Sequence, residues 1–398
     1  MATNRSLTPR SSVLVVGMLD SIHFARWLEQ FSEEPIDFHV FPSGPHRAVH
    51  PRLKALANSS LLAQYKITWA QMPISLIVWI VDKFFGQRIR GHFIKRLITS
   101  LQPLIVHALE IQNAGYSVLA AYQSMTPELR PTLVATNYGS DIYWFQRKAR
   151  HRRKIASLLS LTDVYAAECM RDAHLADCLG FKGRHHEINP NAGGFALSRF
   201  DAPLLDDSNR DTIAVKGYHG WAGRGILALR ALSKLDEFPT EIKIEVFSAN
   251  VVTAVYATFL RVARRLDVRV HLKGSLSHDQ VLDIFAKSKV YVGVSRTDGI
   301  STSMLEAMLQ GAIPVQSSTS CCDEWFDESG AIISANNVES VRLAIGQGLA
   351  LSASEKFRTH NRNVVRIRAN ETRVRCASIN LYKSLTSVAS QPGRRDAS

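Results

Sequence analysis

Residues 291–316 read YVGVSRTDGISTSMLEAMLQGAIPVQ, and this stretch predicts a strand, a polar loop, a helix and a second strand. The first strand is the apolar run 291–294, and Gly311 marks the end of the helix. Strands and helices in this order build a parallel α/β sheet, in which ligands bind at the carboxyl ends of the strands. We therefore expect an α/β fold with a binding loop after residue 294.

The predicted helix begins with Ser301, Thr302 and Ser303, so its free N–H groups and its positive dipole end face the loop and favour an anion. Two acids flank this position, Asp298 in the loop and Glu306 on the helix. Both carboxylates can reach one ligand from the same edge. Alternatively, Ser303 and Glu306 form a capping box, in which the Glu306 carboxylate only accepts a backbone N–H bond.

The pattern S-x-x-D-G-I-S-x-x-x-L-E-A-M-x-x-G-x-I-P-V resembles the Glu-x7-Glu signature of retaining GT-B glycosyltransferases of family four. The resemblance implies two facing Rossmann-like domains with an interdomain cleft. It also implies transfer of a sugar from a nucleotide diphosphate sugar to an acceptor hydroxyl with retention of anomeric configuration. Asp298, where the family has Glu, would contact the sugar. Donor-binding roles fall by position on Gly299, Ile300, Ser301, Thr302 and Glu306, with Glu306 on the ribose.

A glycine-rich loop, KGYHGWAGRG, follows the predicted strand 212–215 and carries Lys216 and Arg224. Glycines permit close approach of a diphosphate and the two cations neutralise its charge. The resemblance implies that this pair stabilises the departing nucleotide diphosphate. It also places Lys273, Gly274 and Leu276 near the nucleotide base.

The strand 13–17 opens a Rossmann-like first domain but lacks G-x-G-x-x-G, so a dinucleotide site is not indicated. By resemblance, His107, at the predicted end of the strand 104–106, is a catalytic candidate. Family members carry His-x-His-Glu at this point, and this chain has Leu109 in place of the second His. The resemblance assigns the acceptor side to loops holding Asp20, Ser21, His23, Glu110, Gly139, Ser140 and Asp141.

The chain has 398 residues, which suits two domains, and 48 Lys and Arg against 35 acids, which favours anionic partners. We predict an acceptor-binding domain over 1–195 and a nucleotide-sugar-binding domain over 205–365. Residues 366–398 should form a helix that returns to the first domain, followed by a disordered tail. The sequence contains no Asp-x-Asp and no cysteine spacing typical of zinc, so we expect no metal and no cofactor beyond the co-substrate.

Residues 74–98 read ISLIVWIVDKFFGQRIRGHFIKRLI, in which apolar residues alternate with cations and only Asp82 is acidic. This composition is typical of an interfacial helix on an anionic membrane surface. It suggests a lipid-linked or envelope glycan as acceptor. The alternative is a pair of core-packed helices with solvated Lys and Arg. A second basic run, RKARHRRK at 147–154, is either a solvated helix face or an attraction for a phosphorylated or lipid-linked acceptor.

The N-terminus is polar, and the longest apolar run is far shorter than the ~18 residues that span a bilayer, so we expect a cytoplasmic protein, peripheral at most on the inner face of the membrane. Two other functions stay open. A nucleotide-sugar 2-epimerase would share the fold but use no acceptor. A basic nucleic-acid-binding protein would use 147–154 and the C-terminal helix, although nucleic acid is not expected because it leaves 291–316 unexplained.

Overall fold

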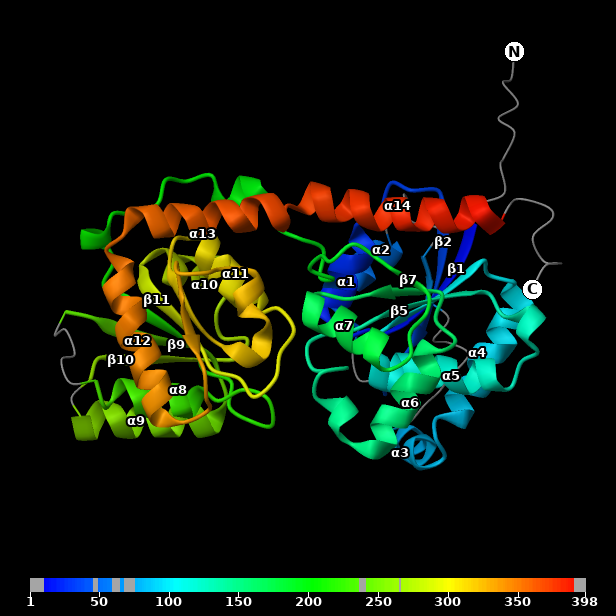
Figure 1. Ribbon diagram of the computed structural model, residues 1–398, viewed down its shortest axis with the longest axis horizontal. Coiled ribbons are helices and arrows are strands. Elements are labelled where there is room, and N and C mark those ends of the chain that lie inside the picture. Colours follow the sequence, from blue (N-terminus) through cyan, green and yellow to red (C-terminus); the bar gives the residue numbers. More distant parts are fainter. Residues whose placement is uncertain are drawn as a thin grey trace, which may run out of the picture. The chain divides into compact units, whose positions relative to one another are not determined.

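The computed structural model describes residues 11–45, 49–58, 65–67, 76–235, 241–264 and 266–389. The chain forms two compact units (Figure 1), unit 1 of Met1–Gly194 with Glu371–Ser398 and unit 2 of Phe195–Asn370. The predicted tail beyond residue 389 lies outside the described residues. Each unit is a parallel sheet with helices packed against it, so the predicted α/β fold class is confirmed.

Unit 1 has a seven-stranded sheet of order β3-β2-β1-β4-β5-β6-β7, and its paired strands are parallel. The strands are β1 (Ser11–Gly17), β2 (Ile36–Pro42), β3 (Tyr65–Ile67), β4 (Ile105–Leu109), β5 (Thr132–Thr136), β6 (Val164–Ala166) and β7 (Arg184–His185). The helices are α1 (Ile22–Glu29), α2 (Pro51–Asn58), α3 (Leu76–Phe84), α4 (Arg88–Leu101), α5 (Tyr116–Gln123), α6 (Ala149–Leu159), α7 (Met170–Cys178) and α14 (Glu371–Ala389).

Unit 2 has a six-stranded parallel sheet of order β10-β9-β8-β11-β12-β13. The strands are β8 (Thr212–Lys216), β9 (Lys243–Ala249), β10 (Val268–Leu272), β11 (Ser288–Gly293), β12 (Ile313–Ser317) and β13 (Ala331–Ile333). The helices are α8 (Gly225–Leu232), α9 (Val251–Arg264), α10 (His278–Ala286), α11 (Thr302–Leu309), α12 (Val338–Ser352) and α13 (Glu355–Arg368).

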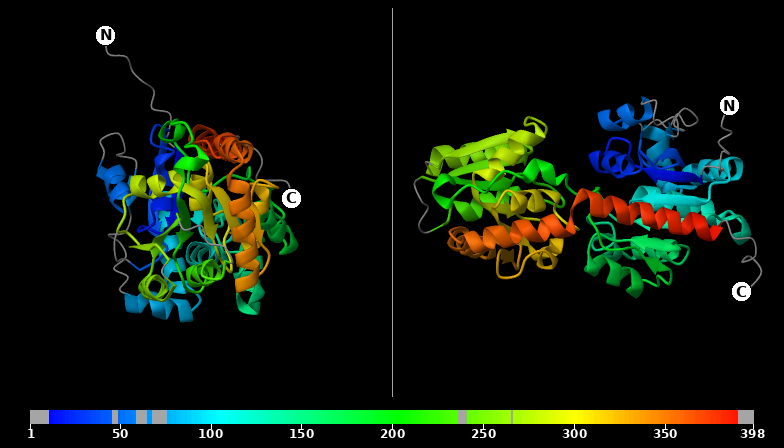
Figure 2. Two further views of the ribbon diagram at one scale, coloured as in Figure 1. Left: turned by 90° about the vertical axis from the view of Figure 1, so that its left-hand side faces the viewer. Right: turned by 90° about the horizontal axis from the view of Figure 1, so that it is seen from above.

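Helices on both faces explain why the central strands are apolar throughout (Figure 2). In β1, Leu14 and Val16 enter one hydrophobic cluster while Val13 and Val15 enter the other. All four side chains are fully buried. A continuous apolar run of this kind predicts a buried parallel strand, and the core lies on both sides of it.

Strand order reverses between β1 and β4 in unit 1 and between β8 and β11 in unit 2. At such a point the two loops leave the carboxyl edge toward opposite faces of the sheet and open a crevice. The loops in question begin after residues 17 and 109 in unit 1 and after residues 216 and 293 in unit 2. The order of the strands therefore marks one ligand-binding edge in each unit.

The segment 76–101 differs from the single interfacial face that we predicted, because it forms two helices and α4 buries its apolar side. Ile94, Leu97 and Ile98 belong to the core. Gly91 allows α4 to approach α5 closely, since a Cβ at residue 91 would lie 2.7 Å from the Cβ of Ala120. For α4 the alternative of core packing is correct. None of the described helices combines the length and the apolar character that crossing a bilayer requires.

Candidate functional site

In unit 2 the residues predicted to bind the donor phosphates meet at the carboxyl edge of β8 and β11. Lys216 ends β8, and its Nζ atom lies 3.7 Å from Oδ2 of Asp298 and 3.4 Å from Oγ of Ser301. Burial lowers the pKa of Lys216, but its electrostatic interactions with Tyr291, Asp298 and Glu306 and its hydrogen bond to Asp298 outweigh burial, so the pKa stands above the ordinary value. The ammonium group therefore stays charged beside the helix that begins at residue 302.

Ser301 is the N-cap residue of α11, and its hydroxyl belongs to a small hydroxyl cluster. The hydroxyl of Tyr291 lies 3.2 Å from Oγ of Ser301 and 3.0 Å from Oγ of Ser303. The first N–H groups of a helix have no partner within the helix. The amide of Gly299 donates to the Asp298 carboxylate at 3.0 Å, which shapes the loop before the helix. These groups form a positive, donor-rich surface suited to a phosphate.

Glu306 lies in the second turn of α11 and is buried. Its Oε1 atom is 2.8 Å from Nε2 of His278, the first residue of α10. The ring's other nitrogen accepts from Arg199 Nη1 at 3.0 Å, and Arg199 also pairs with Asp279. The capping-box alternative is wrong, because Ser301 rather than Ser303 occupies the N-cap position of α11 and the Glu306 carboxylate bonds the side chain of His278.

The glycine loop after β8 closes on itself. Gly225 packs on Gly217, so that a Cβ at residue 225 would lie 2.6 Å from the Gly217 carbonyl oxygen. Arg224 donates from Nη1 to the carbonyls of Gly220 and Gly223. Burial and then the charge of Arg296 lower the pKa of Arg224. The structure therefore folds Arg224 onto its own loop, beside a second cation that sequence reasoning missed.

The three residues assigned to the nucleotide base lie at the end of β10, the edge strand of the sheet. Lys273 donates its backbone N–H to Ala249, and Gly274 has a φ of 83°, which favours glycine. Both are exposed, while Leu276 is half-buried. The structure connects this loop to the site through His278, but it places neither Lys273 nor Gly274 against Lys216 or Glu306.

The catalytic prediction for His107 needs correction. The strand β4 extends two residues beyond His107, so this residue lies mid-strand and only 2% exposed rather than at a strand end. Its Nδ1 atom is 2.6 Å from the Tyr382 hydroxyl and its Nε2 atom 2.7 Å from Oγ1 of Thr136. Burial, with a smaller effect of His186, lowers the pKa of His107 to about 3. His107 is therefore a neutral residue of the unit 1 core.

Glu110, Asp141 and Gly139 do come together at the carboxyl edge of unit 1. Oδ2 of Asp141 accepts from the amides of Ile111 at 2.9 Å and Tyr138 at 3.1 Å, which ties the loop after β5 to the loop after β4. Burial and then the charge of Glu110 raise the pKa of Asp141 to about 8. Burial also raises the pKa of Glu110.

Glu110 has a φ of 101° and a ψ of 149°, a backbone region that only glycine adopts easily and that costs about 1–3 kcal/mol. Strain of this kind concentrates at functional sites. Sequence reasoning missed Glu168, which lies two residues beyond β6 and accepts from the amides of Gly139 and Asn191. Its position directly after the apolar run 164–167 was the available signal.

The remaining unit 1 candidates lie in the loop after β1. Ser21 is the N-cap of α1, and its Oγ accepts from the amides of His23 at 3.2 Å and Phe24 at 3.4 Å. Asp20 and His23 are exposed, and Ser140 is half-buried. Ser21 thus has a structural role at the start of α1.

Neither the models of protein families nor the curated proteins contain a match to the sequence. Solved structures do match. A sucrose-phosphate synthase from Thermosynechococcus elongatus has a TM-score of 0.72 at 12% identity, over 95% of this chain and 100% of that one.

A glycosyltransferase from Rickettsia africae has a TM-score of 0.65 at 13% identity, over 95% and 99% of the two chains. Anabaena HepE, solved in complex with UDP-glucose, has a TM-score of 0.61 at 12% identity, over 94% and 99%. These matches confirm the predicted GT-B fold of two Rossmann-like domains.

Proposed function

We propose that this chain is a retaining glycosyltransferase that moves a sugar from a nucleotide diphosphate sugar to an acceptor hydroxyl. The observation that carries the proposal is the meeting of Lys216, Asp298 and the α11 N-terminus at the β8–β11 edge, with Glu306 on the same helix. The fold likeness to glycosyltransferases, one of them solved with UDP-glucose, supports it.

The proposed roles of these residues follow from the negative charge that develops on the diphosphate. Breaking the bond between sugar and phosphate leaves negative charge on the diphosphate, and preorganised positive groups stabilise that charge most. Lys216 and the N–H groups at the start of α11 are these positive groups. Glu306, held by His278, accepts hydrogen bonds from the ribose hydroxyls. Asp298 orients Lys216 and contacts the sugar.

We propose that this reaction needs no metal ion, because the sequence has no Asp-x-Asp to hold one at the diphosphate. Arg224 and Arg296 add positive charge beside the glycine loop. The acceptor hydroxyl attacks on the face from which the diphosphate leaves and passes its proton to the departing phosphate oxygen, so the configuration is retained without a protein nucleophile.

We further propose that unit 1 binds the acceptor, a lipid-linked or envelope glycan, through the loops that hold Asp20, His23, Glu110 and Asp141. The strained backbone of Glu110 and the raised pKa of Asp141 support this edge as the acceptor side. A carboxyl group that keeps its proton near neutral pH can donate a hydrogen bond to a sugar oxygen.

The test is a thermal-shift panel of UDP-, GDP- and ADP-sugars, followed by measurement of nucleotide diphosphate release. One donor should raise the melting temperature of the wild type and not of Glu306→Ala. The matched control is Glu339→Ala, an exposed acid on α12 that pairs with Arg342. A panel without any response refutes the proposal. Release of an altered free sugar without acceptor would identify a 2-epimerase instead.

A further inference from the structure

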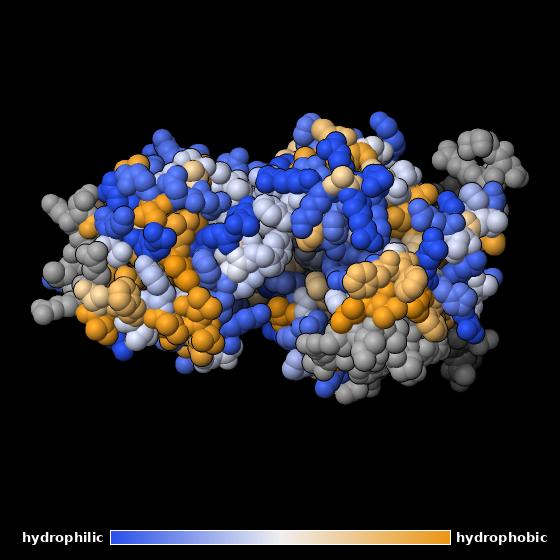
Figure 3. Space-filling view, turned by 90° about the horizontal axis from the view of Figure 1, so that it is seen from below, coloured by the Kyte–Doolittle hydropathy of each residue, from blue (hydrophilic) through white to orange (hydrophobic). Residues whose placement is uncertain are grey.

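Two adjacent aromatic side chains project from unit 1 where α3 ends. Phe84 is 79% exposed and Phe85 is 64% exposed, and Ile80 and Val81 in the preceding turn are exposed as well. Figure 3 views the molecule from the side on which α3 lies in Figure 1 and shows apolar patches among hydrophilic residues. Exposed apolar side chains that cluster in this way mark an interaction surface rather than scattered surface residues.

A buried ion pair lies in the same segment as this aromatic pair. Asp82 and Arg90 have fully buried side chains, and Nε of Arg90 donates to Oδ2 of Asp82 at 2.6 Å. Oδ1 of Asp82 accepts from the amide of Ile89 at 2.8 Å. Arg90 also donates to the carbonyl of Ser43. Asp82, the only acid of residues 76–101, is therefore buried together with Arg90. The other charged residues of this segment are all cations.

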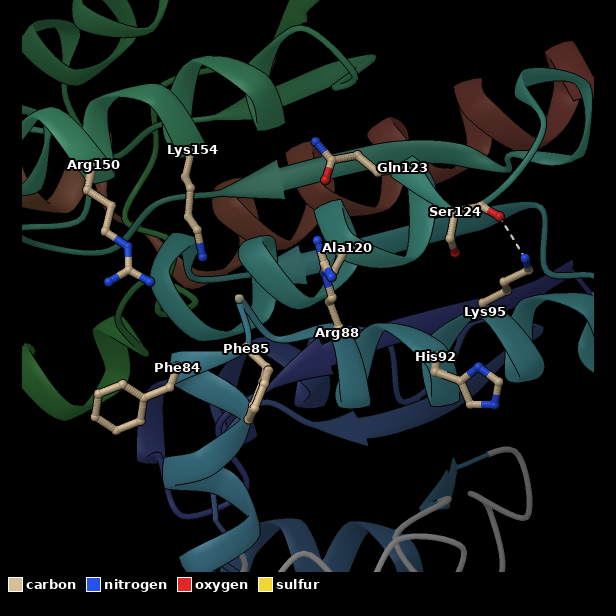
Figure 4. Close-up of a pocket in the computed structure, with 11 residues that line it drawn as sticks. Phe84, Phe85, Arg88, His92, Lys95, Ala120, Gln123, Ser124, Arg150 and Lys154 are labelled. Atoms are coloured by element: carbon tan, nitrogen blue, oxygen red, sulfur yellow. Dashed lines mark hydrogen bonds between the residues drawn. The ribbon is translucent and has the colours of Figure 1, made fainter.

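Cations from two distant segments meet next to the aromatic pair. An open pocket of about 800 Å³ is lined by Phe84 and Phe85, by Arg88 and Lys95 of α4, and by Arg150 and Lys154 of α6. Figure 4 shows these side chains with His92 around one opening. No Asp or Glu is among the described residues that line it. The two basic runs of the sequence thus build one surface.

Two of the four cations of this pocket donate hydrogen bonds to neutral groups. Lys95 donates to the carbonyl of Ser124 at 2.6 Å and Lys154 to Oε1 of Gln87 at 3.1 Å. Within the described residues none of the four cations is ion-paired. Burial and then the charges of Arg150 and Arg90 lower the pKa of Lys154, which shows how closely the positive groups crowd. An anion in the pocket would relieve this repulsion.

We propose that this face of unit 1, defined as Phe84, Phe85, Arg88, Lys95, Arg150 and Lys154, docks on an anionic phospholipid bilayer. The aromatic pair enters the head-group boundary and the four cations contact lipid phosphates. Phosphate alone would explain the cations but not two exposed phenyl rings beside them, which need an apolar environment. The inference is independent of the proposed glycosyltransferase activity.

The experiment is sedimentation of the full-length protein with vesicles, without nucleotide sugar. Vesicles of phosphatidylglycerol and phosphatidylcholine should bind the wild type, and pure phosphatidylcholine should not. Arg150→Glu with Lys154→Glu should weaken binding at least about tenfold. Phe84→Ser with Phe85→Ser should weaken it by a similar factor. The matched control is Phe259→Ser on α9, where the side chain is 62% exposed.

The melting temperature of each variant is first compared with that of the wild type. If the charge reversal unfolds the chain, the double variant Arg88→Gln with Lys95→Gln replaces it in the binding assay. Equal binding to both vesicle types would overturn the proposal, as would loss of binding in Phe259→Ser. The proposal would also be overturned if the protein did not bind vesicles but bound a single-stranded oligonucleotide through Arg150 and Lys154. This result would identify a nucleic-acid-binding surface.

Discussion

Nε2 of His278 lies 2.8 Å from Oε1 of Glu306, while Nδ1 of the same ring accepts from Arg199 at 3.0 Å. A ring that accepts at Nδ1 carries its proton on Nε2, so His278 is the donor to the carboxylate. One oxygen of Glu306 is thereby fixed, and among the described residues no hydrogen bond reaches the other. His278 is a positioning residue of the proposed nucleotide site.

Glu306→Gln should raise the Kd for the nucleotide by about 10- to 100-fold, because a hydrogen bond to a charged group contributes about 1.5–3 kcal/mol. His278→Ala should raise it by about three- to tenfold, since the carboxylate survives but loses its orientation. Isothermal titration with UDP, GDP and ADP measures both, with Glu339→Gln as control. Unchanged affinity in Glu306→Gln would assign Glu306 to the fold alone.

Lys216→Ala should lower kcat by about 10²- to 10³-fold, the usual effect of removing one group that stabilises transition-state charge. Lys216→Arg should recover part of the rate, because the cation is restored. A structural role for Lys216 would instead reduce stability in both variants, so melting temperatures are measured alongside the release of nucleotide diphosphate.

The rate of the wild type should hold on the alkaline side up to the ordinary lysine pKa of 10.5, since the pKa of Lys216 is raised and the cation is lost only above that value. The pH–rate profile of Lys216→Arg is the comparison. A fall centred near about pH 8 in the wild type and missing in Lys216→Arg would contradict the assignment.

Tyr382→Phe should lower the free energy of unfolding by about 1–2 kcal/mol, because it leaves the buried Nδ1 of His107 without its partner. Nucleotide affinity should not change, since His107 belongs to the core. Urea denaturation and titration calorimetry check the two parts. Tyr256→Phe, on a half-buried residue of α9, is the control. A loss of activity without a loss of stability would return His107 to the catalytic candidates.

Asp141→Asn should make the protein more stable at pH 8 and leave it about equally stable at pH 4. The pKa of Asp141 is about 8 in the folded chain against an ordinary 3.8, so between these values the folded state binds more protons. Stability therefore falls as pH rises through this window, and asparagine, which mimics the protonated acid, removes the loss. Urea denaturation at both pH values, with the exposed Asp283→Asn as control, tests the sign.

The regular elements were predictable where residue type alone determines them. The strand over 212–215 was predicted to within one residue of its observed bounds, Thr212–Lys216, because its apolar run ends at a glycine-containing turn. The bounds of β4 were not, since a fully buried strand shows no alternation that marks its end. This error moved His107 from the middle of the strand to its edge.

Only those residues of the candidate site that lie at the ends of predicted strands could be predicted from the sequence. Lys216, Asp298 and Ser301 come together as expected from two strand ends, but His278 and Arg199 approach Glu306 across long stretches of sequence. No local pattern predicts such a partner. The face that α4 presents was likewise undetermined, because an apolar stripe beside cations suits a core and a membrane equally, and only the Gly91–Ala120 contact decides.

Unit 1 is discontinuous in sequence. The 176 residues of unit 2, from Phe195 to Asn370, separate its first part from the part that contains the helix α14. Tyr382 lies 5.0 Å from the Phe31 ring and 6.0 Å from the Phe38 ring, inside the first part's core. During synthesis from the N-terminus, unit 2 is contiguous and emerges complete from the ribosome before α14 does. The core of unit 1 can therefore be completed only after all of unit 2 has been synthesised.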